Sequence, residues 1–250
     1  MFKESYYLFV RKMKATVRQP VWIVVSLSTP LLLIALYAPL LRGMGGDNQT
    51  IGEVLNMFVP GLLTLIAFSA GISAGWEVIL DLRDGVIERF RVTSARRFSI
   101  LMGTVFHDIV MFLVPATFLL IIALPFGFRI DVGGLLVLLV LLCLLTAVLS
   151  AWSCAMALII KEMGGLSALL SGIQMPLMLL AGILLPLSHG PRWLEILGHF
   201  NPLFYTVEAA RDLATGDIFT NSVGLAFAIF LPLVILTMWW STRVHKKAIK

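Results

Sequence analysis

Residues 134–157 read GLLVLLVLLCLLTAVLSAWSCAMA, a stretch without a single charged side chain. A helix needs about twenty mostly apolar residues to cross the hydrocarbon core of a bilayer, so this stretch by itself predicts a membrane span. The composition of the whole chain agrees. Hydrophobic residues make up 59% of its 250 residues and charged residues only 13%, whereas about a quarter of an average soluble domain is charged. We therefore expect an integral membrane protein.

Several stretches satisfy the same length criterion, and together they predict six spanning helices. They lie at about 21–41, 54–75, 103–125, 134–157, 166–187 and 222–241. The first follows a basic stretch and carries no small-residue cleavage site, so we expect it to stay as an anchor and not to act as a signal peptide. Because the spans follow one another throughout, 1–250 is expected to form a single transmembrane domain.

The basic residues set the expected orientation. An even number of spans places both termini on one side, and the 19 Lys and Arg residues fall on that side except for Arg42, Arg129, Arg192 and Arg211. Positively charged segments face the cytoplasm, so both termini are expected there. The formal charge of +5 gathers at the ends of apolar runs, which indicates a membrane surface and not a nucleic-acid partner.

The N-terminal segment 1–20 has a helical pattern of its own. Apolar residues recur at helical spacing and basic residues fall on another face: Phe2, Tyr6, Phe9, Met13 and Val17 against Arg11, Lys14 and Arg18. This pattern predicts a basic amphipathic helix in the inner membrane interface, in contact with lipid. The alternative, a solvated basic tail, would expose the aromatic side chains to water.

The segment 76–102 is the largest expected cytoplasmic connection. Its carboxylates recur at helical intervals, which places them on one face: Glu77, Asp81, Asp84 and Glu88. Gly85 interrupts the pattern. The sequence thus predicts a helical connector with a charged face and a bend.

The outer segment 188–221 is too broken by proline and glycine to span. Pro191 can begin one short helix, and Asn201 with Pro202 forms a cap and first-turn pair for a second helix that ends at Gly216. Irregular backbone is not tolerated in contact with lipid tails. We expect a re-entrant or interfacial helical hairpin.

His107 and Asp108 are ionisable residues inside the third expected span. Such residues are costly in a membrane and often functional. Two interpretations stay open: a structural role, in which Asp108 reaches the interface or pairs with Arg96 or Arg97, and a role in gating or cargo binding.

Several kinds of active site are absent from the pattern or poorly supported by it. The chain has no G-x-x-x-x-G-K-[ST] loop for ATP, and no Cys/His spacing typical of a metal site. Residues 71–75, GISAG, match the G-x-S-x-G nucleophile elbow, but an elbow needs a strand-turn-helix context. Packing of small residues is favoured over an intramembrane hydrolase with Ser73 as nucleophile. A secondary transporter would need a coupling-ion site and usually internal repeats, neither of which is visible.

Two motifs carry a family resemblance. Residues 83–93, RDGVIERFRVT, followed by Arg97 and the sequence ILMG at 100–103, resemble the signature between the second and third spans of type-2 ABC permeases. Val86 and Phe90 stand where that family usually has Thr and Leu. The sequences PRWL at 191–194, NPL at 201–203 and EAAR at 208–211, with Gly216, are similar to the stretch before the last span of the same family.

The resemblance implies a function and partners. Such permeases pair as dimers, here expected to be homodimers, with a heterodimer of this chain and a similar permease as the alternative, and each binds an ABC ATP-binding subunit through the helix after span two. The resemblance places Asp84, Gly85, Glu88 and Arg89 at or near that contact. The outer motif contributes Trp193, Asn201, Pro202, Glu208 and Arg211.

The same resemblance implies efflux across a bacterial plasma membrane, as in drug-resistance exporters, with no enzyme activity or cofactor in this chain because the partner subunit binds ATP. Few polar residues lie in the spans, so hydrophobic or amphipathic drugs or lipids are the expected cargo. A cell-envelope glycan is the alternative; its channel would be expected to carry more aromatic residues than four Tyr.

Overall fold

The computed structural model describes residues 2–18, 25, 28, 31–36, 51–86, 97–183 and 191–248. Its elements there are helices, without a strand in the described ranges. They are α1 (Phe2–Val17), α3 (Ile51–Arg83), α5 (Arg97–Ala123), the 3₁₀ turn η1 (Leu124–Phe126), α6 (Val132–Ile160), α7 (Met163–Leu180), α8 (Arg192–Gly198), α9 (Pro202–Thr215) and α10 (Asn221–Ala248). The expected all-α class is confirmed.

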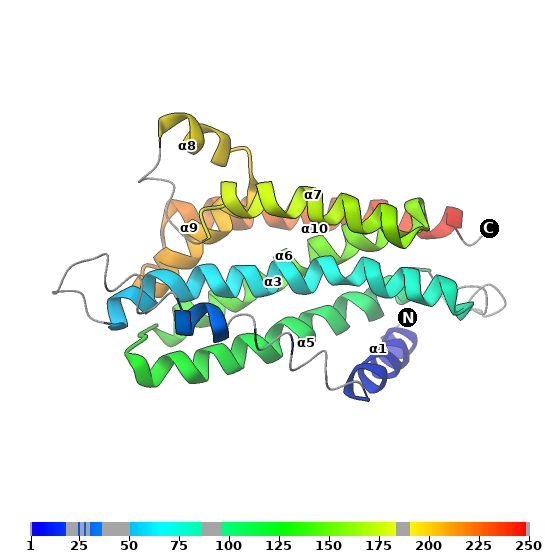
Figure 1. The fold of residues 1–250 in the computed structure, drawn as a ribbon, viewed down its shortest axis with the longest axis horizontal. Coiled ribbons are helices and arrows are strands. Elements are labelled where there is room, and N and C mark those ends of the chain that lie inside the picture. The colour runs from blue at the N-terminus through cyan, green and yellow to red at the C-terminus, as the bar shows by residue number, and fades with distance from the viewer. Residues whose placement is uncertain are drawn as a thin grey trace.

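Among the described residues, α3, α5, α6, α7 and α10 are long and apolar enough to cross a membrane. They run side by side along the long axis of the molecule (Figure 1). Most of the expected span at 21–41 lies outside the described residues. Within this span, residues 31–36 are described and are helical. The count of six spans therefore stays a prediction.

The helix α3 lies at the centre of the bundle and packs closely along α6. Gly71 and Gly75 make this approach possible, because a Cβ atom on Gly75 would lie 2.4 Å from Ser153 Oγ. Ser153 Oγ donates a hydrogen bond to the carbonyl of Ile72 over 2.7 Å and accepts one from the backbone N–H of Gly75 over 3.1 Å. Small residues of this kind let membrane helices come together without lipid between them.

The GISAG sequence is therefore a packing motif. Ser73 lies in the interior of α3, is exposed, and donates its hydroxyl hydrogen to the carbonyl of Ala70 over 2.7 Å. The backbone around it is helical on both sides, so the strand-turn-helix context of a nucleophile elbow is missing. The expectation that small residues account for this motif agrees with the structure.

The helix α3 contains the second expected span, 54–75, and continues to Arg83 without interruption. Val78 and Ile79 are buried, so the apolar stripe of the helix extends beyond Glu77. The first part of the expected connector 76–102 is consequently the end of a long helix, and only its later part follows a turn.

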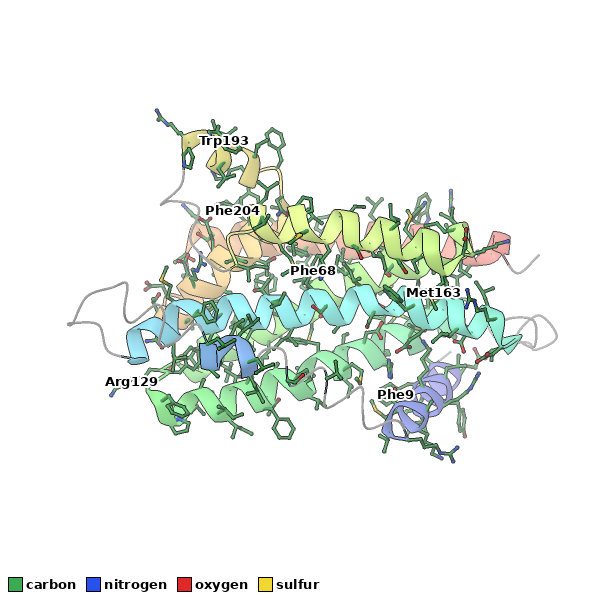
Figure 2. The ribbon with its side chains drawn as sticks, viewed as in Figure 1. Phe9, Phe68, Arg129, Met163, Trp193 and Phe204 are labelled. Carbon is green, nitrogen blue, oxygen red and sulfur yellow. The ribbon has the colours of Figure 1, made fainter. Side chains whose placement is uncertain are left out.

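The two ends of the bundle differ in what they carry. At one end lie α1 and the last turn of α3, and at the other lie η1, α8 and α9 (Figure 1). We call them the α1 end and the hairpin end. Figure 2 shows Phe9 on α1 at the first, and Trp193 on α8, which stands apart from the bundle, at the second. The helix α9 is packed against the bundle, where Gly134 of α6 leaves room for the carbonyl of Leu213: a Cβ there would lie 2.5 Å from that oxygen.

Candidate functional site

The helix α1 is docked by one face on the start of α5. Gly103 of α5 allows the close approach, since a Cβ atom there would lie 2.9 Å from Leu8 Cβ and 3.2 Å from the Ser5 carbonyl oxygen. Ser5 is buried, whereas Tyr6 and Tyr7 are 63% and 70% exposed. An amphipathic helix with one face on protein and aromatic side chains pointing outward suits a membrane interface.

Charged residues join α1 to the end of α3. Lys12 Nζ donates to Glu77 Oε2 over 2.9 Å, and Arg11 lies 4.0 Å from the Asp81 carboxylate. Burial alone would lower the pKa of the Lys12 ammonium, but the carboxylates of Glu77 and Asp108 outweigh that effect and hold its pKa above its ordinary value. Lys12 is therefore a permanent positive charge at this contact.

The two ionisable residues of the third expected span, His107 and Asp108, lie next to this ion pair. His107 and Asp108 are each 1% exposed. The ring atom His107 Nδ1 lies 3.1 Å from Asp108 Oδ1 and 3.8 Å from Glu77 Oε1. On the other side of the ring, Nε2 lies 2.9 Å from Thr16 Oγ1 of α1. Ser150 of α6 donates to Asp108 Oδ2.

We call this group of side chains the polar cluster; it consists of Lys12, Thr16, Glu77, His107, Asp108 and Ser150. It joins α1 to α3, α5 and α6. The expected partners of Asp108, Arg96 and Arg97, cannot be placed beside it, because Arg96 and the side chain of Arg97 lie outside the described parts of the chain. The observed partners of Asp108 are Ser150 of α6 and the neighbouring His107.

The chemistry of the polar cluster is that of an ion-pair network. Glu77, His107 and Asp108 bring possible ligand atoms within 4.8 Å of one another, but the Lys12 ammonium already supplies a positive charge to them and would repel a metal cation. A serine, a histidine and an aspartate also meet here, yet Ser150 bonds to the aspartate. In a hydrolytic triad the serine bonds to the histidine, so this order does not activate a nucleophile.

The residues that the resemblance places at the ATPase contact follow α3 in the sequence. The helix ends in a turn at Asp84 and Gly85, where Gly85 has a φ of +66°. That left-handed conformation is one that glycine adopts without strain. Asp84 is exposed. Glu88 and Arg89 lie outside the described residues. Glu77 precedes Asp84 by two turns of helix, about 10 Å.

At the hairpin end, α9 begins and ends as its sequence suggests. Asn201 Oδ1 accepts a hydrogen bond from the backbone N–H of Leu203 over 3.0 Å, Pro202 occupies the first turn, and Gly216 ends the helix with a φ of +97°. Asn201 Nδ2 also donates to the carbonyl of Leu177 on α7 over 2.7 Å. One side chain thus caps α9 and ties it to α7.

Arg211 makes a second tie to the same region. Its Nη2 donates to the carbonyl of Gly182, just after α7, over 2.6 Å. Burial lowers the pKa of this guanidinium, and Glu208 acts against that effect. Trp193 makes no comparable tie among the described residues; it is 61% exposed on α8. Of the outer-motif residues, Asn201 and Arg211 therefore hold the end of α7.

Sequence reasoning missed the partners of the buried charges. It named His107 and Asp108 but not Lys12 or Thr16, which come from a helix distant in the sequence. It placed Glu77 on the charged face of a helical connector. In the sequence, only Lys12 could have indicated this contact. It lies one helical turn before Thr16, on the side of α1 that packs against the bundle.

Comparison with known proteins gives a family. The family described as ABC-2 type transporter has a sequence model that matches residues 4–214. A daunorubicin resistance ABC transporter permease protein, DrrB1, of Streptomyces coeruleorubidus is 24% identical over 94% of this chain and 83% of its own length. A putative transport permease ycf38 of Cyanophora paradoxa is 27% identical over 84% of this chain and 74% of its own length.

Proposed function

The chain belongs to the ABC-2 type transporter family and is a membrane subunit of an ABC transporter; we propose that it exports hydrophobic or amphipathic small molecules, of the drug or lipid class. The observation that carries the proposal is the match of the family over residues 4–214, which include four of the five described helices long enough to span a membrane; α10 follows the matched residues. The family is one of transport permease subunits without an ATPase of their own, and it implies an ABC ATP-binding subunit as partner.

The proposed contact with that partner is the segment after α3, with the turn residues Asp84 and Gly85 and, further along the sequence, Glu88 and Arg89. Asp84 supports it, because it is an exposed charge at the end of a helix that reaches the middle of the bundle. A push on this turn would move α3 along its axis or tilt it. Movement of α3 would then reach α6 through the close packing at Gly71 and Gly75.

The proposed cargo class follows from the surface of the spans. The buried ionisable residues His107 and Asp108 already have partners within the protein. Long stretches of α7 and α10 present apolar side chains, among them Met175, Leu179 and Ile235, outward. An apolar cargo, lipid or a second protomer would suit such surfaces. The name of the Streptomyces relative, which concerns daunorubicin resistance, supports a drug.

The proposed assembly is a homodimer in a bacterial plasma membrane with both termini in the cytoplasm. The positive charges near both termini support the orientation, and the similarity to a Streptomyces permease over 94% of the chain supports the location. The exposed face of α7 supports a second protomer, because it is the least buried of the five described spanning helices.

The test is mild purification of the native complex, followed by ATP hydrolysis measurements in lipid vesicles. We expect an ATP-binding subunit to accompany the chain, and hydrophobic cations such as daunorubicin to stimulate hydrolysis severalfold. Stimulation by a glycan carrier and not by drugs or lipids would establish the alternative cargo. A chain that transports without any ATPase partner would contradict the proposal.

The contact can be tested by charge reversal. Asp84→Lys should weaken co-purification of the ATP-binding subunit at least tenfold. The matched control is Glu162→Lys, an exposed carboxylate between α6 and α7, which should leave co-purification unchanged. Equal behaviour of the two variants would remove Asp84 from the contact.

A further inference from the structure

The polar cluster has an unbalanced charge unless it holds one additional proton. With Lys12 positive, Glu77 and Asp108 negative and His107 neutral, its net charge would be −1. Asp81 does not change this sum, because it faces Arg11 at 4.0 Å. A buried charge without compensation costs several kcal/mol. One of the titratable groups is therefore expected to carry the missing proton.

The hydrogen bonds of Thr16 concern one nitrogen of the His107 ring. A hydroxyl has one hydrogen to donate, and Thr16 Oγ1 donates it to the carbonyl of Lys12 over 3.2 Å. Toward His107 Nε2, 2.9 Å away, Thr16 can then only accept. That nitrogen must carry a hydrogen.

The other ring nitrogen faces two carboxylates. His107 Nδ1 faces Asp108 Oδ1 at 3.1 Å and Glu77 Oε1 at 3.8 Å, and an ionised carboxylate only accepts hydrogen bonds. From these contacts we infer that His107 is an imidazolium with hydrogens on both ring nitrogens. The polar cluster is a charge-balanced proton site that fastens α1 to α3, α5 and α6.

The competing location for the proton is Asp108. A hydrogen on Asp108 Oδ2 could be shared with Ser150, and the cluster would also be neutral. A hydrogen on Asp108 Oδ1, donated to His107 Nδ1, would do the same and would keep both Thr16 contacts. The Glu77 carboxylate favours the proton on His107, because its Oε1 lies 3.8 Å from Nδ1 and the positive ring would then lie beside two carboxylates. Cys154, one turn after Ser150 on α6, is the other buried titratable group that interacts with these charges.

This site links the position of α1 to protonation. The helix α1 contributes both Lys12, a counter-charge, and Thr16, the acceptor for the imidazolium. Removal of α1 would leave two carboxylates with one positive charge and would expose the site.

Nitrogen NMR of the full chain in lipid bilayers, labelled with ¹⁵N-histidine, tests the proton position. The spectrum distinguishes a ring with two N–H groups from either neutral form, and His107→Gln identifies the signal among four histidines. At neutral pH we expect His107 to be doubly protonated. Glu77→Gln removes one negative charge, so it should convert His107 mainly to a singly protonated ring.

The matched control for that change is Glu162→Gln, an exposed carboxylate, which should leave the His107 signal as it is. A singly protonated His107 in the native chain would overturn the inference and would leave Asp108 as the holder of the proton. An unchanged His107 signal in Glu77→Gln would also overturn it, because charge balance would then not set the protonation.

A labelling experiment tests whether the site fastens α1. Ser5→Cys, buried on the docked face, is placed in a chain with Cys143→Ala and Cys154→Ala, and its reaction rate with a maleimide is measured. Lys12→Met should raise the rate at least tenfold. Lys14→Met removes the same charge from an exposed position of α1 and should raise it less than twofold. Equal rates in the two variants would show that the polar cluster does not hold α1.

Discussion

The α1 end and the hairpin end are both tied together by polar side chains, but the ties differ in kind. At the α1 end, Lys12 meets Glu77, and His107 meets Asp108, so charge lies on both sides of each contact. At the hairpin end, Asn201 and Arg211 donate to main-chain carbonyls near the end of α7. A main-chain carbonyl can accept a hydrogen bond at any pH, and it is present whichever side chain its residue carries.

The difference predicts different sensitivities. Loss of one member of a buried ion pair costs about 3 to 5 kcal/mol. The side chains of Lys12 and Glu77 are 19% and 36% exposed, so the cost here is expected at the lower limit of that range. Loss of a donor to a carbonyl costs about 1 to 2 kcal/mol. The α1 end is therefore suited to a contact that changes state, and the hairpin end to a fixed attachment of α9 to α7.

The largest effect is expected at Lys12. Lys12→Met should lower the free energy of unfolding by about 3 kcal/mol, because Glu77 and Asp108 lose their permanent positive neighbour. Thermal unfolding in detergent measures the change. Lys12→Met combined with Glu77→Gln should recover at least half of the loss. A double variant less stable than Lys12→Met would contradict the view that charge pairs hold the α1 end while bonds to carbonyls hold the hairpin end.

Asn201 should follow, since it has two functions. Asn201→Ala removes the cap of α9, worth about 1 kcal/mol, and the bond to the Leu177 carbonyl, worth about 1 kcal/mol. The expected loss is about 2 kcal/mol in the same unfolding measurement. Asn201→Asp keeps the capping oxygen but not the donor to α7, so it should lose about half as much; a full loss in this variant would mean that the cap contributes nothing.

Arg211 should matter less than its buried position suggests. Arg211→Met removes the bond to Gly182, but it also relieves the burial of a cation whose pKa is lowered by its surroundings. The net loss is expected to be about 1.5 kcal/mol. Arg211→Lys serves as the comparison, and a variant more stable than the native chain would show that burial outweighs the bond.

The smallest effect on stability is expected at the turn after α3. Gly85→Ala should cost about 1 kcal/mol, because alanine is strained in the left-handed conformation although nothing lies near its Cβ atom. Gly85→Asn should cost less, since asparagine adopts that conformation more readily. Circular dichroism on heating measures both, and equal losses would point to a role of Gly85 other than its backbone angle.

The sequence predicted the helices better than their contacts. Apolar runs located the described spans, and Asn201, Pro202 and Gly216 located α9, because length, capping and left-handed turns act over a few residues. The expected span 54–75 and the first part of the expected helical connector form one helix, α3, which passes Glu77 without interruption. In the folded chain Lys12 lies beside that carboxylate.

The polar cluster was beyond sequence reasoning for a related reason. Lys12 and Glu77 are 65 positions apart, and Asp108 and Ser150 are 42 apart. Helical periodicity describes the faces of one helix and does not say which helices meet. His107 and Asp108 could be recognised as unusual within a span, but only the packing of α1 and α6 around α5 supplies their partners.

The most direct test of the central claim, that opposite charges hold α1 on the spans, is a charge-exchange cycle between Lys12 and Glu77. Unfolding is measured for Lys12→Glu, for Glu77→Lys and for the chain with both changes. Residues in contact couple by about 0.5 to 3 kcal/mol, whereas independent ones add within about 0.5 kcal/mol. We predict that the double variant is at least 1 kcal/mol more stable than the sum of the single losses implies. Additive losses would contradict the account.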